Sequence, residues 1–408
     1  MHETPSTGFQ HTAATQRYIC FVTETYLPEV NGVALTLAHL VKGLRAQGHE
    51  VSLVHPYRRT SERLGGGCDT QVTFVRGLPL PGYKGLQFGL PASGLLRRSW
   101  TQHRPDVVYV ATEGPLGWSA VRAARRLGIP IFSGFHTNFH SYSRYYRASW
   151  SQNAIFRYLR RFHNRTTGTL VPNVDLRDRL QAFGFNNVSV LGRGVDSQLF
   201  TPERRCAALR RQWGAADNDL VVLYVGRVAP EKNLGLALEA YRTMQRCSDS
   251  VKCVVVGEGP LSVALQKEQT DLIFCGVHTG AQLAKHYASA DAFLFPSETE
   301  TFGNVTLEAM ASGLVVVAYD YAAAKMHITH GETGMLAPYG DAKAFVDLAA
   351  KLAREPQSFH KIRQQAREYV ISIDWRRIVE SFAALLTGVY GQSRVAPDTS
   401  RICRSVAT

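Results

Sequence analysis

Two runs of apolar residues on either side of a short polar segment constrain the fold of this chain most strongly. The first run covers residues 292–295 and the second covers residues 314–318. Between them, residues 306–312 have helical character, and Gly313 fits a position that ends a helix. Short apolar strands joined through a helix predict a buried parallel sheet. The loop before the helix should then lie at the carboxyl end of a strand, where open α/β sheets bind ligands.

Two glutamates belong to this polar segment, Glu300 in the predicted loop and Glu308 in the predicted helix. Gly303 and Asn304 stand at the helix start, where backbone N–H groups have no partner within the helix. Such N–H groups and the helix dipole together form an anion site. The segment therefore offers two acceptors for sugar hydroxyls and a set of donors for phosphate, which suits a sugar joined to a nucleotide diphosphate.

Two other interpretations of the glutamates remain open from these residues. They are either solvated surface charges, as most glutamates are, or the acid/base pair of a glycoside hydrolase. The carboxyl groups of such a pair lie roughly 5 to 9.5 Å apart. A continuous helix would separate Glu300 from Glu308 by about 12 Å along its axis. A loop at the start shortens this distance, so the geometry disfavours the hydrolase without excluding it.

Further short apolar strands fall into two series along the chain. A strand at residues 18–23, a helix at 33–47 and a strand at 51–54 form a β–α–β unit, which implies a parallel sheet. The other strands are expected at residues 72–75, 107–110, 131–135, 169–171, 188–191, 221–225, 252–256 and 272–274. For a chain of 408 residues, two doubly wound halves with a boundary near residues 200–202 are the simplest account.

Two cations follow the first strand of the second series. Arg227 and Lys232 belong to the sequence at residues 226–233, at the carboxyl end of that strand. We predict that they face a ligand phosphate, Arg227 as a forked donor and Lys232 as a mobile point charge. They would neutralise a leaving diphosphate as its charge grows, which stabilises the transition state. The alternative is that both are surface cations at a helix start.

Single residues at other strand ends are weaker candidates. Gly32 follows the first strand, where a glycine lets the backbone approach a phosphate, although an ordinary helix start is the alternative. His136 ends an apolar strand and is either a donor to a substrate or a structural histidine. Gly257 begins a Gly-x-Gly turn, but Ser262 replaces the third glycine of a dinucleotide fingerprint. This departure argues against a nicotinamide enzyme.

The segment with Glu300 and Glu308 resembles the Glu-x7-Glu motif of family-4 retaining glycosyltransferases of the GT-B fold, and the resemblance extends over residues 17–390. It implies that Glu300 hydrogen-bonds the donor sugar and that Glu308 holds the nucleotide ribose. The backbone amides that would meet the sugar and the phosphates are those near Phe302, Gly303 and Asn304.

The same resemblance implies roles for the other loops. The loop with Gly32 would face the donor diphosphate across an interdomain cleft, Gly257 would face a phosphate or the base, and backbone at Val277 would read the nucleobase. The residues with implied catalytic roles are His136, Arg227, Lys232 and Glu300. No cofactor is implied beyond the donor substrate, which is GDP-mannose or a UDP-sugar.

The implied fold class is α/β, with two doubly wound Rossmann-like domains that face a cleft. The expected parts are an N-terminal acceptor-side domain at residues 17–198, a C-terminal nucleotide-sugar-binding domain at 199–373, a helix at 374–390 that crosses back, and flexible ends at 1–16 and 391–408. Attack on the sugar would come from the same face as the departing phosphate, so the anomeric configuration would be retained.

The net charge of +13 points to an anionic partner. Residues 141–165 hold six arginines and no acid, interleaved with aromatic residues. Such a helix suits a membrane interface with anionic lipids. The residues expected to contact the membrane or the acceptor are Arg144, Arg147, Trp150, Arg157, Arg160 and Arg161. The alternatives are a helix whose aromatics pack inward and whose arginines are merely solvated, or stacking on single-stranded nucleic acid. No usual nucleic-acid motif appears elsewhere, so we expect no nucleic-acid partner.

Other patterns exclude several classes of protein. No run of about 18 apolar residues predicts a transmembrane helix, and residues 1–16 lack the apolar core of a signal peptide. The seven cysteines are scattered and form no Cys-x-x-Cys pair, so neither a disulfide framework nor a zinc site is expected. No metal motif survives, since Asp217 and Asp219 precede a strand instead of following one. We expect a metal-independent cytoplasmic protein, peripheral on the inner face of the membrane; its oligomeric state is not indicated.

These patterns and the resemblance together predict a glycosyltransferase, and the resemblance implies that it is a retaining one. It would move a hexosyl group (mannose, glucose or glucuronate) from a nucleotide diphosphate sugar to a membrane glycolipid or diacylglycerol-type acceptor. The overall pattern resembles bacterial GDP-mannose-dependent α-mannosyltransferases and lipid glycosyltransferases that use UDP-sugars. The alternatives are a soluble or polysaccharide acceptor, a nucleotide-sugar epimerase of the same fold, and a catalytically dead protein that binds membranes.

Overall fold

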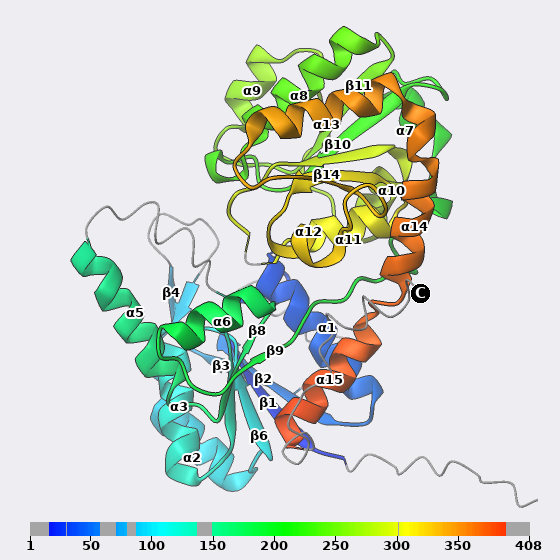
Figure 1. The fold of residues 1–408 in the computed structure, drawn as a ribbon. Coiled ribbons are helices and arrows are strands. Elements are labelled where there is room, and N and C mark those ends of the chain that lie inside the picture. The colour runs from blue at the N-terminus through cyan, green and yellow to red at the C-terminus, as the bar shows by residue number, and fades with distance from the viewer. Residues whose placement is uncertain are drawn as a thin grey trace, which may run out of the picture.

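A computed structural model describes residues 16–29, 31–57, 71–79, 87–136, 149–300 and 302–388, without the side chains of residues 149–152. Two parallel sheets organise these residues (Figure 1). The first sheet has the order β3-β2-β1-β6-β7-β8-β9 and the second has the order β12-β11-β10-β13-β14-β15. The α/β prediction with two doubly wound halves is confirmed.

The first sheet and its helices occupy the N-terminal half. Its strands are β1 (Tyr18–Val22), β2 (Glu50–Pro56), β3 (Gln71–Val75), β6 (Val107–Val110), β7 (Ile131–Gly134), β8 (Gly168–Val171) and β9 (Val188–Val190). Its helices are α1 (Gly32–Ala46), α2 (Ser93–Gln102), α3 (Pro115–Leu127), α5 (Ser149–His163) and α6 (Val174–Ala182). A separate antiparallel pair joins β4 (Gly77–Pro79) to β5 (Gln87–Gly89).

The second sheet begins after the 3-10 turn η2 (Pro202–Arg204) and α7 (Ala207–Gln212). Its strands are β10 (Leu220–Val225), β11 (Val251–Val256), β12 (Ile273–Phe274), β13 (Ala292–Phe295), β14 (Val315–Tyr319) and β15 (Met335–Ala337). Its helical segments are η3 (Pro230–Lys232), α8 (Leu234–Cys247), α9 (Ser262–Glu268), α10 (Gly280–Ser289), α11 (Asn304–Ala311), α12 (Ala322–His327), α13 (Ala342–Arg354), η4 (Pro356–Phe359) and α14 (His360–Ile371).

The central strands of each sheet are buried on both faces. On β1, Phe21 packs in one core cluster and Cys20 in another, and both are almost fully buried. On β10, Leu223 and Tyr224 divide between two clusters in the same way. Because successive side chains of a strand point to opposite faces, the strands read as continuous apolar runs with no polar alternation. This is why sequence patterns located these strands, while β4, β5 and β15, with three residues each, were missed.

The strand order reverses at the first strand of each sheet. Strand β1 pairs with β2 on one side and β6 on the other, and β10 pairs with β11 and β13. The connections that leave two such neighbouring strands run to opposite faces of the sheet, so a crevice opens at their carboxyl ends. The loops after β1, β10 and β13 therefore lie at the two places where this fold class binds ligands.

The chain crosses back to the first sheet after α14. Helix α15 (Trp375–Thr387) lies along α1, as Figure 1 shows in orange-red beside blue. The ring of Phe382 is fully buried and meets Phe21 and Tyr109 at centroid distances of 5.9 and 5.0 Å. A Cβ on Gly43 of α1 would lie 2.4 Å from Val379, so the two helices pack too closely for any larger residue there. The helix is thus part of the first core.

Arg367 fixes the connection between the two halves. Its Nη1 donates to the carbonyls of Phe200 and Ala311 at 2.8 and 2.7 Å, and its Nη2 donates to the carbonyl of Ser197 at 2.9 Å. A second link is the ion pair of Lys325 with Asp175 at 2.7 Å. The precise domain boundaries, at residues 198 and 373, stay a prediction. Apart from Gln16, both predicted flexible ends lie outside the described residues.

Replacing Phe382 with alanine should destabilise the protein by about 3–5 kcal/mol, because a fully buried aromatic ring leaves a cavity between α15, β1 and β6. Urea unfolding measures the free energy. Glu380→Ala, at an exposed position of the same helix, is the control and should change stability by less than about 0.5 kcal/mol. Equal effects of the two variants would show that α15 does not belong to the first core.

Candidate active site

Lys232 and Glu300 meet at the point where strand order reverses in the second sheet. Lys232 ends η3 after β10, and Glu300 lies in the loop after the neighbouring strand β13. The Lys232 ammonium forms an ion pair with Glu300 Oε1 and also donates to the Thr299 carbonyl at 3.4 Å. Both side chains are less than one-fifth exposed. The sequence places them 68 residues apart, and the sheet brings them together.

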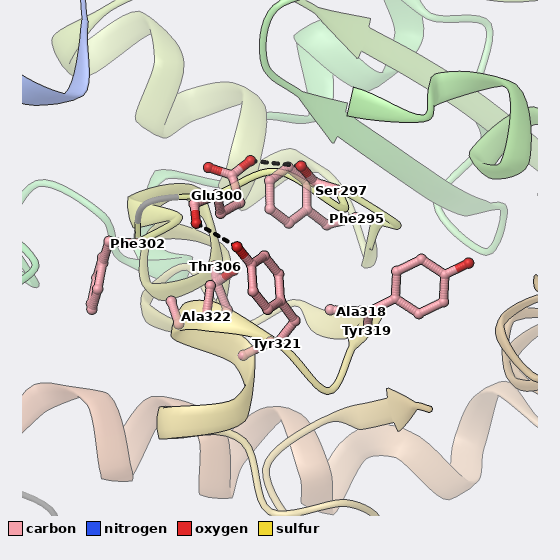
Figure 2. A pocket seen from close by; sticks show the side chains of 11 residues that line it. Phe295, Ser297, Glu300, Phe302, Thr306, Ala318, Tyr319, Tyr321 and Ala322 are labelled. Atoms are coloured by element: carbon pink, nitrogen blue, oxygen red, sulfur yellow. Dashed lines mark hydrogen bonds between the residues drawn. The ribbon is translucent and has the colours of Figure 1, made fainter. Parts of the chain in front are cut away.

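Two hydroxyl groups hold Glu300 in place. Ser297 Oγ donates to Glu300 Oε1 at 2.8 Å, and Tyr321 OH donates to the Glu300 carbonyl at 2.9 Å, as the dashed lines of Figure 2 show. These residues line a small hollow that is partly open to solvent, together with Phe295 and Tyr319. Ser297, from the loop after β13, therefore orients the Glu300 carboxylate, and Tyr321, from the loop after β14, holds its backbone.

The loop continues into the N-terminus of α11. Gly303 has φ +97°, a left-handed conformation that glycine adopts at least cost, and no side chain of the described residues caps the helix. The Phe302 ring is 5% exposed and packs against His327, so only its backbone can meet a ligand. Asn304 is the first helical residue. The helix start presents backbone N–H groups beside Glu300, which is the arrangement of an anion site.

Glu308 lies one to two turns into α11 and is only partly accessible to solvent. Burial raises the pKa of its carboxyl from 4.5 to about 7, and the Tyr287 hydroxyl on α10 partly offsets this effect. A carboxyl group with such a pKa accepts hydrogen bonds as the anion only above neutral pH and donates as the acid below it. Its surroundings are not those of an ordinary surface glutamate.

Arg227 is placed differently from Lys232. Its side chain is 54% exposed and forms an ion pair with Glu231, four residues on. The Glu231 carbonyl in turn accepts from Thr299 Oγ1 at 2.9 Å, which ties the loop after β10 to the loop after β13. Arg227 thus stands at the rim of the site and Lys232 stands inside it.

Gly257 and Val277 lie on the next loops of the same sheet edge. Gly257 has φ +131°, and a Cβ there would stand 2.0 Å from the Gly226 carbonyl oxygen. Glycine is therefore required at this position by the close approach of the loops after β10 and β11, whatever ligand it faces. Val277 is 54% exposed, which is compatible with the predicted contact between its backbone and a ligand.

Gly32 opens α1 at the reversal point of the first sheet. The Asn31 side chain caps the helix by accepting from the Ala34 N–H at 2.9 Å. Nothing lies within 4 Å of a Cβ added at Gly32. The backbone geometry does not demand glycine here, so the open space in front of the helix start is the feature that would admit a ligand.

His136 follows β7 and lies among polar groups of the first sheet. Arg193 Nη2 is 3.1 Å from His136 Nδ1, and Tyr109 OH is 3.3 Å from Nε2. Burial, Arg193 and His163 together hold the pKa of His136 well below its ordinary value. Sequence reasoning missed Arg193 and Tyr109. The only signal was an arginine between two glycines just after a strand.

The basic segment is described only in part. Arg144 and Arg147 lie outside the described residues, and the side chain of Trp150 is not described. On α5, the side chains of Arg157, Arg160 and Arg161 are exposed. The opposite face of the same helix is buried, with Phe162 at 0% and Leu159 at 6% exposure. The helix is amphipathic, with inward apolar and outward basic side chains.

Neither a metal centre nor a membrane span is found in the part of the chain that the structure describes. No group of three or more His, Cys, Asp or Glu side chains there is arranged to hold a metal ion. None of the helices within the described ranges is long and apolar enough to cross a membrane.

Comparisons with known proteins agree with this geometry. Residues 30–199 match the model "Glycosyltransferase Family 4", and residues 207–369 match "Glycosyl transferases group 1". A GDP-mannose-dependent alpha-mannosyltransferase of Mycobacterium tuberculosis is 33% identical over 92% of this chain and 97% of its own length. The chain belongs to this glycosyltransferase family. The predicted family and enzyme class are thereby confirmed.

One further relative and one solved structure are also similar to this glycosyltransferase. An alpha-monoglucosyldiacylglycerol synthase of Streptococcus pneumoniae is 29% identical over 73% of this chain and 70% of its own length. The crystal structure of Anabaena HepE in complex with UDP superposes with a TM-score of 0.74 at 20% identity, covering 91% of this chain and all of that one. The latter likeness concerns the fold alone and confirms the predicted GT-B architecture.

Replacing Glu308 with glutamine should stabilise this glycosyltransferase at pH 8. A carboxyl whose pKa is raised on folding lowers the free energy of unfolding of the protein as the pH rises from 4.5 to about 7, by about 3 kcal/mol in total. Glutamine does not titrate, so the variant should be more stable than the wild type by this full amount above pH 7 and by none of it below pH 4.5. Thermal unfolding between pH 4.5 and 8 measures it. The exposed Glu239→Gln on α8 is the control, and a pH-independent difference for Glu308→Gln would contradict the assignment.

Proposed function

We propose that this glycosyltransferase moves a hexosyl group from a nucleotide diphosphate sugar to a membrane glycolipid or diacylglycerol-type acceptor, with retention at the anomeric carbon. The observation that carries the donor side is the meeting of Lys232 with Glu300 at the reversal point of the second sheet. Glu300 can accept hydrogen bonds from sugar hydroxyls and Lys232 can bind phosphate, and both lie next to the N-terminus of α11, which no side chain of the described residues caps. The donor is GDP-mannose or a UDP-sugar.

Donor binding exchanges the partners of this ion pair. Glu300 accepts from hydroxyls of the sugar, and Lys232 turns to the diphosphate, joined by Arg227 from the rim. Backbone amides at Gly303 and Asn304 complete the contacts with the phosphates and the sugar. The remaining donor contacts are those of Glu308 with the ribose, Val277 with the base, and Gly257 and Gly32 with the phosphates or the base.

The transfer follows from these contacts. The acceptor oxygen bonds to the anomeric carbon as the bond from that carbon to the phosphate oxygen breaks, on the same face of the sugar. The acceptor proton passes to the departing phosphate, so that no protein base is needed. Lys232 and Arg227 stabilise the charge that grows on the diphosphate, and His136 donates beside the reacting carbon. Because these cations take the place of a divalent ion, we expect transfer to be independent of metal.

The acceptor assignment draws on relatives and on α5. Curated relatives include alpha-monoglucosyldiacylglycerol synthases and a phosphatidylinositol dimannoside mannosyltransferase, whose names specify lipid acceptors. The exposed Arg157, Arg160 and Arg161 suit an anionic lipid surface. The enzyme would work as a peripheral protein on the cytoplasmic face of the membrane.

Incubation with radiolabelled UDP-glucose, UDP-glucuronate or GDP-mannose and total bacterial lipid tests the function, and label should enter the lipid phase, with or without EDTA. Arg227→Ala should lower kcat by about 10²–10³-fold, the usual effect of removing one charge-stabilising donor. Glu300→Ala should abolish most donor binding. The exposed Arg211→Ala is the matched control.

Three other outcomes would each overturn part of the proposal. Label in a soluble product would favour a soluble or polysaccharide acceptor, and an altered free nucleotide sugar would favour an epimerase. Full transfer activity in both Arg227→Ala and Glu300→Ala would refute the donor site.

Binding to liposomes tests the basic face of α5. Vesicles with anionic phosphatidylglycerol should bind the protein at low salt and release it at about 0.5 M salt, where the Debye length falls below about 5 Å. Replacing Arg157, Arg160 and Arg161 with glutamine should weaken binding by about 1 kcal/mol for each charge removed. The same replacement of Arg122, Arg125 and Arg126 on α3 is the control. Equal losses in both triple variants would point to net charge and not to α5.

A further inference from the structure

Arg193 is a buried cation of the first sheet that the donor site does not use. It follows β9, is 6% exposed, and its Nη1 reaches the carbonyls of Leu191 and Gly192 only at 3.4 Å. No carboxylate among the described residues lies within ion-pair distance of it. A buried guanidinium without a carboxylate is costly, so its placement calls for an explanation. It comes closer to His136 Nδ1 than to either carbonyl, at 3.1 Å.

The loop that carries Arg193 is held firmly against the crossing helix. A Cβ on Gly194 would stand 2.7 Å from the backbone nitrogen of Trp375, the first residue of α15. Next to it, the Val195 N–H donates to the Ile373 carbonyl at 3.1 Å. The loop that carries the Arg193 guanidinium is therefore fixed by the backbone of residues 373–375, where the chain crosses back to the first sheet.

The His136 ring is held equally closely on its other side. A Cβ on Gly134 would stand 2.4 Å from His136 Nε2 and 2.2 Å from the Tyr109 hydroxyl oxygen. The missing side chain of Gly134 thus creates the space in which the ring and the hydroxyl meet. Burial raises the pKa of Tyr109 to about 12, so this hydroxyl stays protonated and neutral.

The contact between Arg193 and His136 determines where the imidazole proton lies. A guanidinium has donors only, so His136 Nδ1 must accept. A neutral imidazole that accepts at Nδ1 carries its proton on Nε2. Protonation of Nδ1 would place two N–H groups and two positive charges against each other at 3.1 Å. Arg193 therefore disfavours both the other tautomer and the imidazolium.

We propose that Arg193 is a positioning residue that holds His136 as the neutral tautomer with its proton on Nε2. The single N–H of His136 then has a fixed direction: the Tyr109 hydroxyl accepts it in the free protein, at 3.3 Å, and a substrate group takes the place of that hydroxyl in the transfer. His136 does not act as a general acid or base. This inference rests on the proposed place of His136 beside the reacting carbon. Its statement about the tautomer, however, concerns the free protein and is tested without any substrate.

Nuclear magnetic resonance of protein with ¹⁵N-labelled histidine gives the first test. The His136 signals, assigned by their loss in His136→Gln, should show a proton on Nε2 only, from pH 6 to pH 8. The described groups that face the ring are Tyr109 from β6, Arg193 from the loop after β9 and His163 from α5. A proton on Nδ1, or an imidazolium at pH 7, would overturn the proposal in the wild-type protein itself.

The variant Arg193→Met gives the second test, with Arg193→Lys as the conservative control that keeps a donor and a charge. In Arg193→Met the two tautomers should mix, and kcat should fall about tenfold, as for one lost hydrogen bond. The fall should deepen toward pH 6 as the pKa of His136 rises, while the donor KM stays unchanged. Arg193→Lys should restore most of kcat and the single tautomer.

The outcomes separate this inference from the proposed function. An unchanged tautomer and an unchanged pH profile of kcat in folded Arg193→Met would refute the role of Arg193. A mixed tautomer together with full activity of His136→Gln would leave the role of Arg193 standing and refute the place of His136 in the reaction. If Arg193→Met does not fold, the spectrum of the wild-type protein decides.

Discussion

The position of β10 at the centre of the second sheet is the constraint on which the site depends. It pairs along its whole length with β11 on one side, and through Val222 and Leu223 with β13 on the other, so neither neighbour can move without breaking a ladder. The loops after β10 and β13 must then emerge side by side. Lys232 and Glu300 come from these two loops, so the strand order brings the two side chains close enough to form their ion pair.

This ion pair also shapes how a donor would enter. A carboxylate and an ammonium that are both mostly buried satisfy each other in the free protein, since either one alone would carry a large desolvation cost. In the donor site that we propose, a nucleotide sugar would replace both partners at once, with hydroxyls for Glu300 and phosphate for Lys232. The first sheet also has a buried cation at the end of a strand. This cation, Arg193, contacts the neutral imidazole of His136 instead of a carboxylate.

Much of this could be predicted from the sequence because fully buried parallel strands are continuous apolar runs, and ligands bind after them. Glu300, Lys232 and His136 were found by their place after such runs. Other features have no local signal. The Phe302 ring turns into the core, which leaves only its backbone for a ligand. Gly257 proves to be required by the Gly226 carbonyl, a contact between loops 31 residues apart.

The sequence by itself determined the fold class and the family, and it singled out the loops in which we place the donor site, because each depends on patterns within a few neighbouring residues. Only the tertiary structure decided which side chains meet. It paired Glu300 with Lys232, raised the pKa of Glu308 by burial, and aimed Arg193 at His136. These outcomes depend on distances and on exclusion of water between segments far apart in the chain, and no local pattern of residues encodes either.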